Sequence, residues 1–163
     1  MKAAAERSPA DDLIEMAYDA LEGAEDLMAY HARHGTPSLL VLTQHSPHIA
    51  IETARLLREH IDGKRVVEVG AGVGFLAIEM AKRAKSVIAI ESDPAWSWVF
   101  TRSLLAHKPA NLSWVFGTAE SVADIVRGDI AVVCTRSGHE AMRKVALRMA
   151  PRVIFPLDEL GAK

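Results

Sequence analysis

Two acidic residues and three glycines stand at spacings that could hold the hydroxyl groups of a nucleotide-like ligand. Glu68 precedes glycines at every second position, Gly70, Gly72 and Gly74, and Glu91 stands at the end of the next apolar run. A glycine-rich turn lets a ligand reach the backbone because no side chain intervenes, and a carboxylate at Glu91 could accept hydrogen bonds from both hydroxyls of a ribose. The spacing therefore indicates a nucleotide-type binding site. The alternative interpretation is a glycine-rich turn without a ligand.

These residues need a strand before the turn, a helix after it and a second strand beyond. Apolar runs predict strands at Arg65–Val69 and Ser86–Ile90, and helical spacing predicts a helix over Phe75–Lys85. Strands and helices alternate along the rest of the chain. The expected fold is α/β, doubly wound, with a mainly parallel five-stranded sheet of order 3-2-1-4-5 and helices on both faces. The further predicted strands are Ser113–Phe116, Ile130–Cys134 and Val153–Phe155, and the further helices run from Asp93-Pro94 to His107, from Ala119 to Val126 and from His139 to Met149.

Two more helices are expected before this alternation begins. An apolar stripe predicts a first helix from Ser8 or Asp11 to about His34, and Ser46-Pro47 is typical of the start of a second helix that continues to Ile61. We therefore expect a flexible N-terminus at 1–9, a helical cap at 10–62 and a Rossmann-like core at 63–158, all within one compact domain.

Composition excludes several classes of protein. Half of the 163 residues are hydrophobic, but no apolar run is long enough to cross a membrane, and the polar start of the chain is unlike a signal peptide. One cysteine, Cys134, rules out an internal disulfide and suits the reducing cytoplasm. The net charge is −2, and no basic excess is evident of the kind that nucleic-acid-binding proteins usually carry. We therefore expect a cytoplasmic protein that binds neither membranes nor nucleic acid.

The order of the glycines separates candidate cofactors. Dinucleotide binding uses G-x-G-x-x-G, and the third glycine of that pattern would fall on Phe75. The E-x-G-x-G-x-G pattern from Glu68 to Gly74 instead resembles motif I of the class I methyltransferases that use S-adenosylmethionine. That resemblance implies that Glu68 helps to hold the amino-acid end of the cofactor and Glu91 its ribose, with S-adenosylhomocysteine as the product. A nicotinamide or flavin cofactor is the alternative.

Other segments extend the resemblance over roughly Thr43 to Leu157. Thr43–Pro47 is similar to a segment of the ribosomal RNA adenine dimethyltransferases in which a glutamine region lies against the cofactor. Gly117–Glu120 occupies the place of the loop that contacts the adenine in the family, although Thr118 stands where an aspartate is common. The cofactor-binding residues that the resemblance implies are Gln44, Glu68, Gly70, Ala71, Gly72, Gly74, Glu91, Ser92, Thr118, Ala119 and Glu120.

The chain departs from the dimethyltransferases after the fourth strand. Enzymes that methylate exocyclic amines of bases carry a short motif there with a carboxamide or carboxylate, prolines and an aromatic ring, whereas this chain has Cys134–Glu140 with none of them in that pattern. The terminal hairpin of the full methyltransferase fold also has no counterpart, which would leave the fifth strand at an edge that a homodimer or a partner subunit could cover. We therefore expect a methyltransferase that acts on a small molecule or a protein side chain. The alternative is a catalytically silent cofactor-binding sensor or a subunit of a larger complex.

Candidates for acid–base or metal chemistry are few. His139, Glu140 and His45 are the leads for a general base, because the first two follow the fourth strand and His45 precedes the core. Two H-x-x-H pairs, His31/His34 and His45/His48, have spacing that could hold a metal. Since no cysteine or acid cluster completes such a site, we expect no metal.

Overall fold

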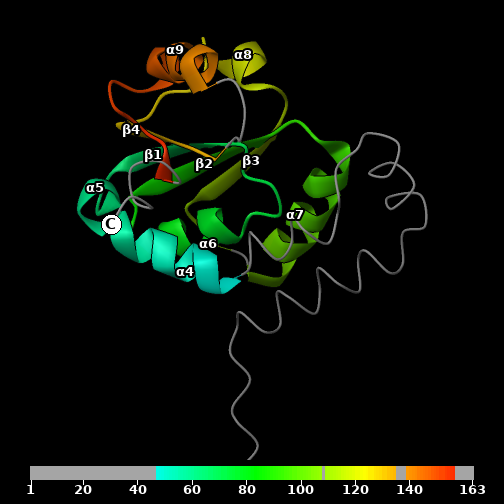
Figure 1. The fold of residues 1–163 in the computed structure, drawn as a ribbon. Coiled ribbons are helices and arrows are strands. Elements are labelled where there is room, and N and C mark those ends of the chain that lie inside the picture. The colour runs from blue at the N-terminus through cyan, green and yellow to red at the C-terminus, as the bar shows by residue number, and fades with distance from the viewer. Residues whose placement is uncertain (1–46, 108, 135–138, 157–163) are drawn as a thin grey trace, which may run out of the picture.

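The computed structural model describes residues 47–107, 109–134 and 139–156, in which strands and helices alternate (Figure 1). Along the chain these elements are α4 (Pro47–Leu56), α5 (Arg58–Ile61), β1 (Arg65–Val69), α6 (Phe75–Ala81), β2 (Ser86–Glu91), α7 (Pro94–His107), β3 (Leu112–Phe116), α8 (Ala119–Val122), β4 (Ile130–Val133), α9 (His139–Met149) and β5 (Val153–Ile154).

The strands form one sheet of order β3-β2-β1-β4-β5, and every neighbouring pair is parallel. The predicted fold class is therefore confirmed. In the register of the sheet, Val69 lies opposite both Ile90 and Val133, so that β1, β2 and β4 end at the same level. We call the side where all the strands end the carboxyl edge and the opposite side the amino edge.

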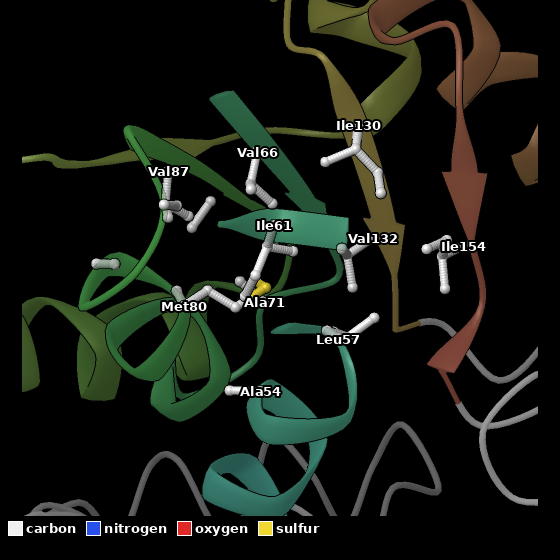
Figure 2. Close-up of a cluster of buried hydrophobic side chains, with 14 of the residues drawn as sticks. Ala54, Leu57, Ile61, Val66, Ala71, Met80, Val87, Ile130, Val132 and Ile154 are labelled. Carbon is white, nitrogen blue, oxygen red and sulfur yellow. The ribbon is translucent and has the colours of Figure 1, made fainter. Parts of the chain in front are cut away.

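Helices cover both faces of the sheet. In Figure 1, α8 and α9 lie on one face, and α4, α5, α6 and α7 lie on the other. Side chains of β1 alternate between the two faces, as a strand requires, so that Val66 and Val67 belong to different buried clusters. Figure 2 shows the cluster under α4, α5 and α6, in which Leu57, Ile61 and Met80 pack against the sheet.

Three helices are shorter than the sequence predicts. The predicted helix over 47–61 is divided at Leu57, which is completely buried. Helix α6 ends at Ala81 rather than Lys85, because the side-chain amide of Asn111 donates hydrogen bonds to the carbonyls of Ala81 (2.8 Å) and Ala84 (3.1 Å). Helix α8 ends at Val122, four residues before its predicted end.

Some predictions concern residues that the structure does not describe. Residues 1–46, which include the predicted first helix and the start of the expected cap, are among them, so the predicted division at 1–9, 10–62 and 63–158 remains a prediction. No helix in the described ranges is long and apolar enough to cross a bilayer.

Candidate functional site

The glycine-rich turn between β1 and α6 lies at the carboxyl edge and has a backbone that only glycine adopts readily. Gly70, Gly72 and Gly74 have φ values of 76°, 56° and 83°, in the left-handed region. The amides of Gly70 and Ala71 both donate to the carbonyl of Ile90 (3.0 and 3.1 Å), which fixes the turn to the end of β2.

The glycines serve different purposes. A Cβ at Gly74 would lie 2.1 Å from the ring of Phe100, so this glycine allows α6 and α7 to pack closely. A Cβ at Gly72 would have no atom of the described residues within 4 Å. The backbone of Gly72 therefore borders open space at the carboxyl edge, where a ligand could lie against it.

Glu91 is held by three hydrogen bonds from backbone amides. Its Oε2 accepts a hydrogen bond from the amide of Gly72 (2.7 Å), and its Oε1 accepts from the amides of Ser92 (2.8 Å) and Asp93 (2.7 Å). The side chain is 7% exposed. A carboxylate has about four acceptor positions, and these three amides leave one for a hydroxyl group of a ligand.

Glu68 lies deeper, at 1% exposure, on the face of β1 that points towards α6. Burial, and secondarily the negative charge of Glu91, raises the pKa of Glu68 to about 8. Its Oε2 has no hydrogen-bond partner among the described residues. A buried acceptor without a partner is costly, so this oxygen suits a cationic or donor group of a ligand.

The thiol of Cys134 is a neighbour that the sequence did not single out for this site. Its Sγ lies 3.9 Å from Oε1 of Glu68, because Cys134 follows β4 directly and β4 pairs with β1. The amide of Cys134 donates to the carbonyl of Val69 (2.9 Å). Burial and the nearby Glu68 raise the pKa of this thiol well above its usual value. The parallel pairing of the first and fourth strands was the signal that could have predicted the contact.

The loop after β3 lies beside Glu91. The amide of Gly117 donates to the backbone carbonyl of Glu91 (2.9 Å), and Phe116 lies opposite Glu91 in the register. Thr118 caps α8, because its hydroxyl accepts from the amide of Ser121 (3.2 Å). Ala119 is buried, whereas Glu120 is exposed.

Phe116 is a second residue that sequence reasoning missed. It is 55% exposed at the carboxyl end of β3, although a large apolar side chain on a strand is usually covered. Its position next to Glu91 makes it a flat apolar surface beside the acid.

The two described leads for a general base have other contacts. The ring of His139 packs against Phe155 with 4.9 Å between the ring centroids. Glu140 is exposed and lies 3.5 Å from Nζ of Lys144, one helical turn further along α9.

The remaining candidates lie outside the described residues or contribute only a backbone group. Gln44 and His45 lie outside the described residues, as do His31 and His34, and nothing is described of the side chain of His48. Ser92 is exposed and contributes its amide to Glu91. The part of the chain that the structure describes contains no group of three side chains able to hold a metal ion.

Known proteins resemble this chain in part of its sequence and in its fold. No protein-family model matches it. It is 41% identical over 51 residues to a protein of Methanosphaera stadtmanae named "Probable ribosomal RNA small subunit methyltransferase A", a match that covers 31% of this chain and 19% of that protein. This match confirms the resemblance to ribosomal RNA methyltransferases over a stretch of that length.

Solved structures of methyltransferases share the fold. The TYW2 protein of M. jannaschii, in complex with AdoMet, has a TM-score of 0.55 and 19% identity, with 62% of this chain and 48% of that chain covered. Precorrin-6y C5,15-methyltransferase of Geobacter metallireducens has a TM-score of 0.52 and 19% identity, with 66% and 57% covered. This chain thus spans about a fifth of the curated relative and about half of these structures. At such identities the likeness shows the fold, which is the Rossmann-like fold of the class I methyltransferases.

Proposed function

We propose that this protein binds S-adenosylmethionine at the carboxyl edge of the sheet and is a methyltransferase. The observation that carries the proposal is the carboxylate of Glu91, which the amide of Gly72 joins to the glycine-rich turn at 2.7 Å. Three backbone amides orient this carboxylate and leave an acceptor position for a ribose hydroxyl. Gly72, with open space beside it, and Oε2 of Glu68, with no hydrogen-bond partner, fit the same ligand as far as the described residues extend.

We assign further contacts with the cofactor to residues other than Glu91 and Gly72. The ammonium of the methionine part would give the buried Oε2 of Glu68 the partner that it lacks among the described residues. Phe116 offers an exposed ring against which an adenine can stack. We assign supporting contacts to the segments already identified, which contribute Gln44, Gly70, Ala71, Gly74, Ser92, Thr118, Ala119 and Glu120.

The proposed methyl transfer depends on how the protein positions the two reactants. When bound, S-adenosylmethionine supplies an activated methyl group that a nucleophile takes by in-line displacement. The protein accelerates such a step chiefly by holding the two reactants aligned and close together. Glu91 and the glycine-rich turn are rigidly joined, so they provide the fixed part of this alignment. No general base is required for a thiolate, a phenolate or a neutral amine, which agrees with the outward contact of Glu140 with Lys144.

The acceptor that we propose is a small molecule or a protein side chain. The segment after β4 reads Cys134-Thr135-Arg136-Ser137-Gly138 and lacks the proline and aromatic residues that hold a base amine in related enzymes. The curated relative is named as a ribosomal RNA methyltransferase, but the residues that would handle a base are not in this stretch of the chain.

Transfer of a radiolabelled methyl group tests the activity. Purified protein is incubated with labelled S-adenosylmethionine and, separately, with amines, phenols, thiols and a mixture of cellular proteins. Label in an acceptor that disappears in a Glu91→Ala variant supports the enzyme. Binding of the cofactor without transfer to any acceptor would favour the alternative, a cofactor-binding sensor or a subunit that acts as a homodimer or with a partner.

A further inference from the structure

The amino edge of the sheet, opposite the proposed cofactor site, gathers basic side chains from four separate parts of the sequence. The segments 58–65, 79–86, 123–129 and 148–152 contain nine basic and five acidic residues, a net charge of +4 in a chain whose total is −2. No single stretch of the sequence shows this excess, which the parallel sheet creates because all its strands begin at the same edge.

Backbone hydrogen bonds hold the basic segments together. The amide of Lys85 donates to the carbonyl of Lys64 (2.8 Å), and the amide of Gly63 donates to that of Arg83 (3.1 Å). The amide of Ala131, in β4, donates to the carbonyl of Arg152 (2.8 Å). The backbone segments that carry these cations are therefore fixed relative to one another by hydrogen bonds.

Acidic neighbours neutralise only some of these cations. Arg65 pairs with Asp129 at 2.8 Å, and hydrogen bonds from Arg65 lower the pKa of Asp129 to about 2, so this pair stays ionised at neutral pH. Three further pairs involve Arg58 with Asp62, Lys82 with Glu79 and Arg148 with Asp124.

Five cations of these segments have no ion pair among the described residues, and four of them, all except Arg83, form a row. Lys85 precedes β2, Lys64 precedes β1, Arg127 precedes β4 and Arg152 precedes β5, in the spatial order of the strands. All four are exposed, and Nη1 of Arg127 donates hydrogen bonds to the carbonyls of Ala123 (2.9 Å) and Val126 (2.8 Å). Since neighbouring strands lie about 4.8 Å apart, the row extends over roughly 14 Å.

We propose that this amino edge, defined by Lys64, Lys85, Arg127 and Arg152, binds the phosphate backbone of a nucleic-acid strand. Each strand of a duplex carries one phosphate for about every 3.4 Å of helix axis, so a row of this length lies alongside more than one phosphate. Ile125, two residues before Arg127, is 80% exposed, whereas the loops that carry Lys64 and Lys85 contain none of the exposed large apolar side chains that usually form the centre of a protein–protein interface. The row of cations therefore matches a chain of phosphates, and the test below separates this partner from an acidic protein.

The location indicates an anchoring role. Strand β1 has five residues, and a rise of about 3.3 Å per residue places the amino edge roughly 16 Å from Glu91. A nucleic-acid strand bound along this row of cations lies at the edge of the sheet opposite the proposed cofactor site. The proposal extends the function without depending on it, and it departs from the sequence-based expectation that the protein does not bind nucleic acid.

Basic residues at this edge have a structural use as well. Helices α6 and α9 end here, and cations near the carboxyl ends of helices stabilise them by a few tenths of a kcal/mol to about 1 kcal/mol each. A purely structural role predicts that substitutions lower stability without affecting any ligand, which the following experiment separates.

The test measures fluorescence anisotropy of a labelled single-stranded RNA of mixed sequence, with a DNA strand of the same sequence in parallel. Wild-type protein is compared with the Lys85→Gln/Arg152→Gln variant and with Arg55→Gln/Lys144→Gln, a control with the same change of charge at two exposed cations of α4 and α9 that do not belong to the row. We expect the edge variant to bind roughly tenfold more weakly and to lose about 1.4 from the slope of log K against log salt, or about 0.7 for each lost contact on a single strand. The control should stay within about twofold of wild type.

Several results would overturn the proposal. One is an equal loss of affinity for the labelled RNA and DNA in both variants. The others are the absence of salt-dependent binding by wild-type protein and tighter binding of poly-glutamate than of the RNA or the DNA. Thermal unfolding of both variants shows whether the substitutions lower the stability of the protein. If the Lys85→Gln/Arg152→Gln variant fails to fold, a Lys64→Gln/Arg83→Gln variant replaces it. Titration with S-adenosylhomocysteine should be the same for the edge variant and wild type, so failure here is distinguishable from failure of the proposed function.

Discussion

Glu91 and Gly72 are joined by a hydrogen bond of 2.7 Å, from the amide of Gly72 to Oε2 of Glu91. The contact links the acid at the end of β2 to the middle of the turn that follows β1. It explains why the two features occur together in the sequence, since each one fixes the position of the other. A ligand placed over the turn would find the acceptor already oriented.

The Glu91→Gln substitution tests this link. The glutamine side chain would keep the shape of the glutamate but remove its charge, and its NH2 group cannot accept from the amides that now face Oε1 and Oε2. Because hydrogen bonds to charged groups contribute about 1.5–3 kcal/mol, we expect S-adenosylhomocysteine to bind at least roughly tenfold more weakly by calorimetry. Glu59→Gln, on the exposed surface of α5, is the matched control and should bind like wild type.

Two glycine substitutions separate ligand binding from backbone strain. Gly72 and Gly63 have similar φ values, 56° and 67°, and a Cβ at either meets no atom within 4 Å. We expect Gly72→Ala and Gly63→Ala to cost about the same stability, roughly 1–2 kcal/mol. Only Gly72→Ala should reduce affinity for S-adenosylhomocysteine, because its methyl group enters the space assigned to the ligand. Equal affinities for the two variants would contradict that assignment.

Gly74→Ala should behave differently from both. Its Cβ would lie 2.1 Å from the ring of Phe100, a buried side chain that cannot move away without disturbing α7. Overpacking and an unfavourable φ of 83° together should cost more than about 3 kcal/mol. Chemical denaturation measures this loss, and a stability within about 1 kcal/mol of Gly63→Ala would show that the packing of α6 against α7 is looser than described.

Stability should depend on pH through Glu68. Its pKa is about 8 in the folded protein against a usual value of 4.5, so the folded state binds the proton more tightly. The resulting stabilisation is complete below about pH 4.5 and is lost as the pH rises through 8. In Glu68→Gln the neutral amide removes this titration, and we expect a gain on the order of a few kcal/mol at pH 8 relative to wild type.

Denaturant titrations from pH 5 to pH 8.5 follow that difference. Other groups titrate in both proteins, so the quantity of interest is the gap between wild type and Glu68→Gln at each pH. A gap that widens with pH agrees with a buried, protonated Glu68. A constant gap would mean that the carboxyl is already ionised in the folded protein.

Thr118 has a structural role that can be separated from its proposed contact with the adenine. Its hydroxyl caps α8 by accepting from the amide of Ser121, and loss of such a cap costs about 1 kcal/mol. Thr118→Ser should preserve the cap and Thr118→Ala should not. If both variants bind S-adenosylhomocysteine like wild type, Thr118 is a cap alone and does not belong to the cofactor site.

The order of the strands and the position of the glycine-rich turn could be predicted because they depend on local patterns. Alternating apolar runs identified each strand to within one or two residues, and the glycines identified the turn. Helix ends were less accurate where a distant side chain contributes to them. Helix α6 stops at Ala81, whose carbonyl accepts a hydrogen bond from the side-chain amide of Asn111, thirty residues later.

Long-range proximity explains what the sequence did not reveal at the site and at the amino edge. Cys134 meets Glu68 only because β4 lies beside β1, and the excess of cations appears only when Lys64, Lys85 and Arg152 begin strands of one parallel sheet. Neither arrangement leaves a signal within a short window of sequence. Both could have been anticipated by placing each residue in the predicted parallel order.

Isothermal titration of the purified protein with S-adenosylhomocysteine, and with NAD on the same sample, tests the central claim most directly. Binding of S-adenosylhomocysteine at micromolar concentration and none of NAD is the predicted result, because the turn carries Phe75 where a dinucleotide site needs its third glycine. Binding of NAD, or of neither compound, would contradict the assignment of Glu91 and the glycine-rich turn to S-adenosylmethionine.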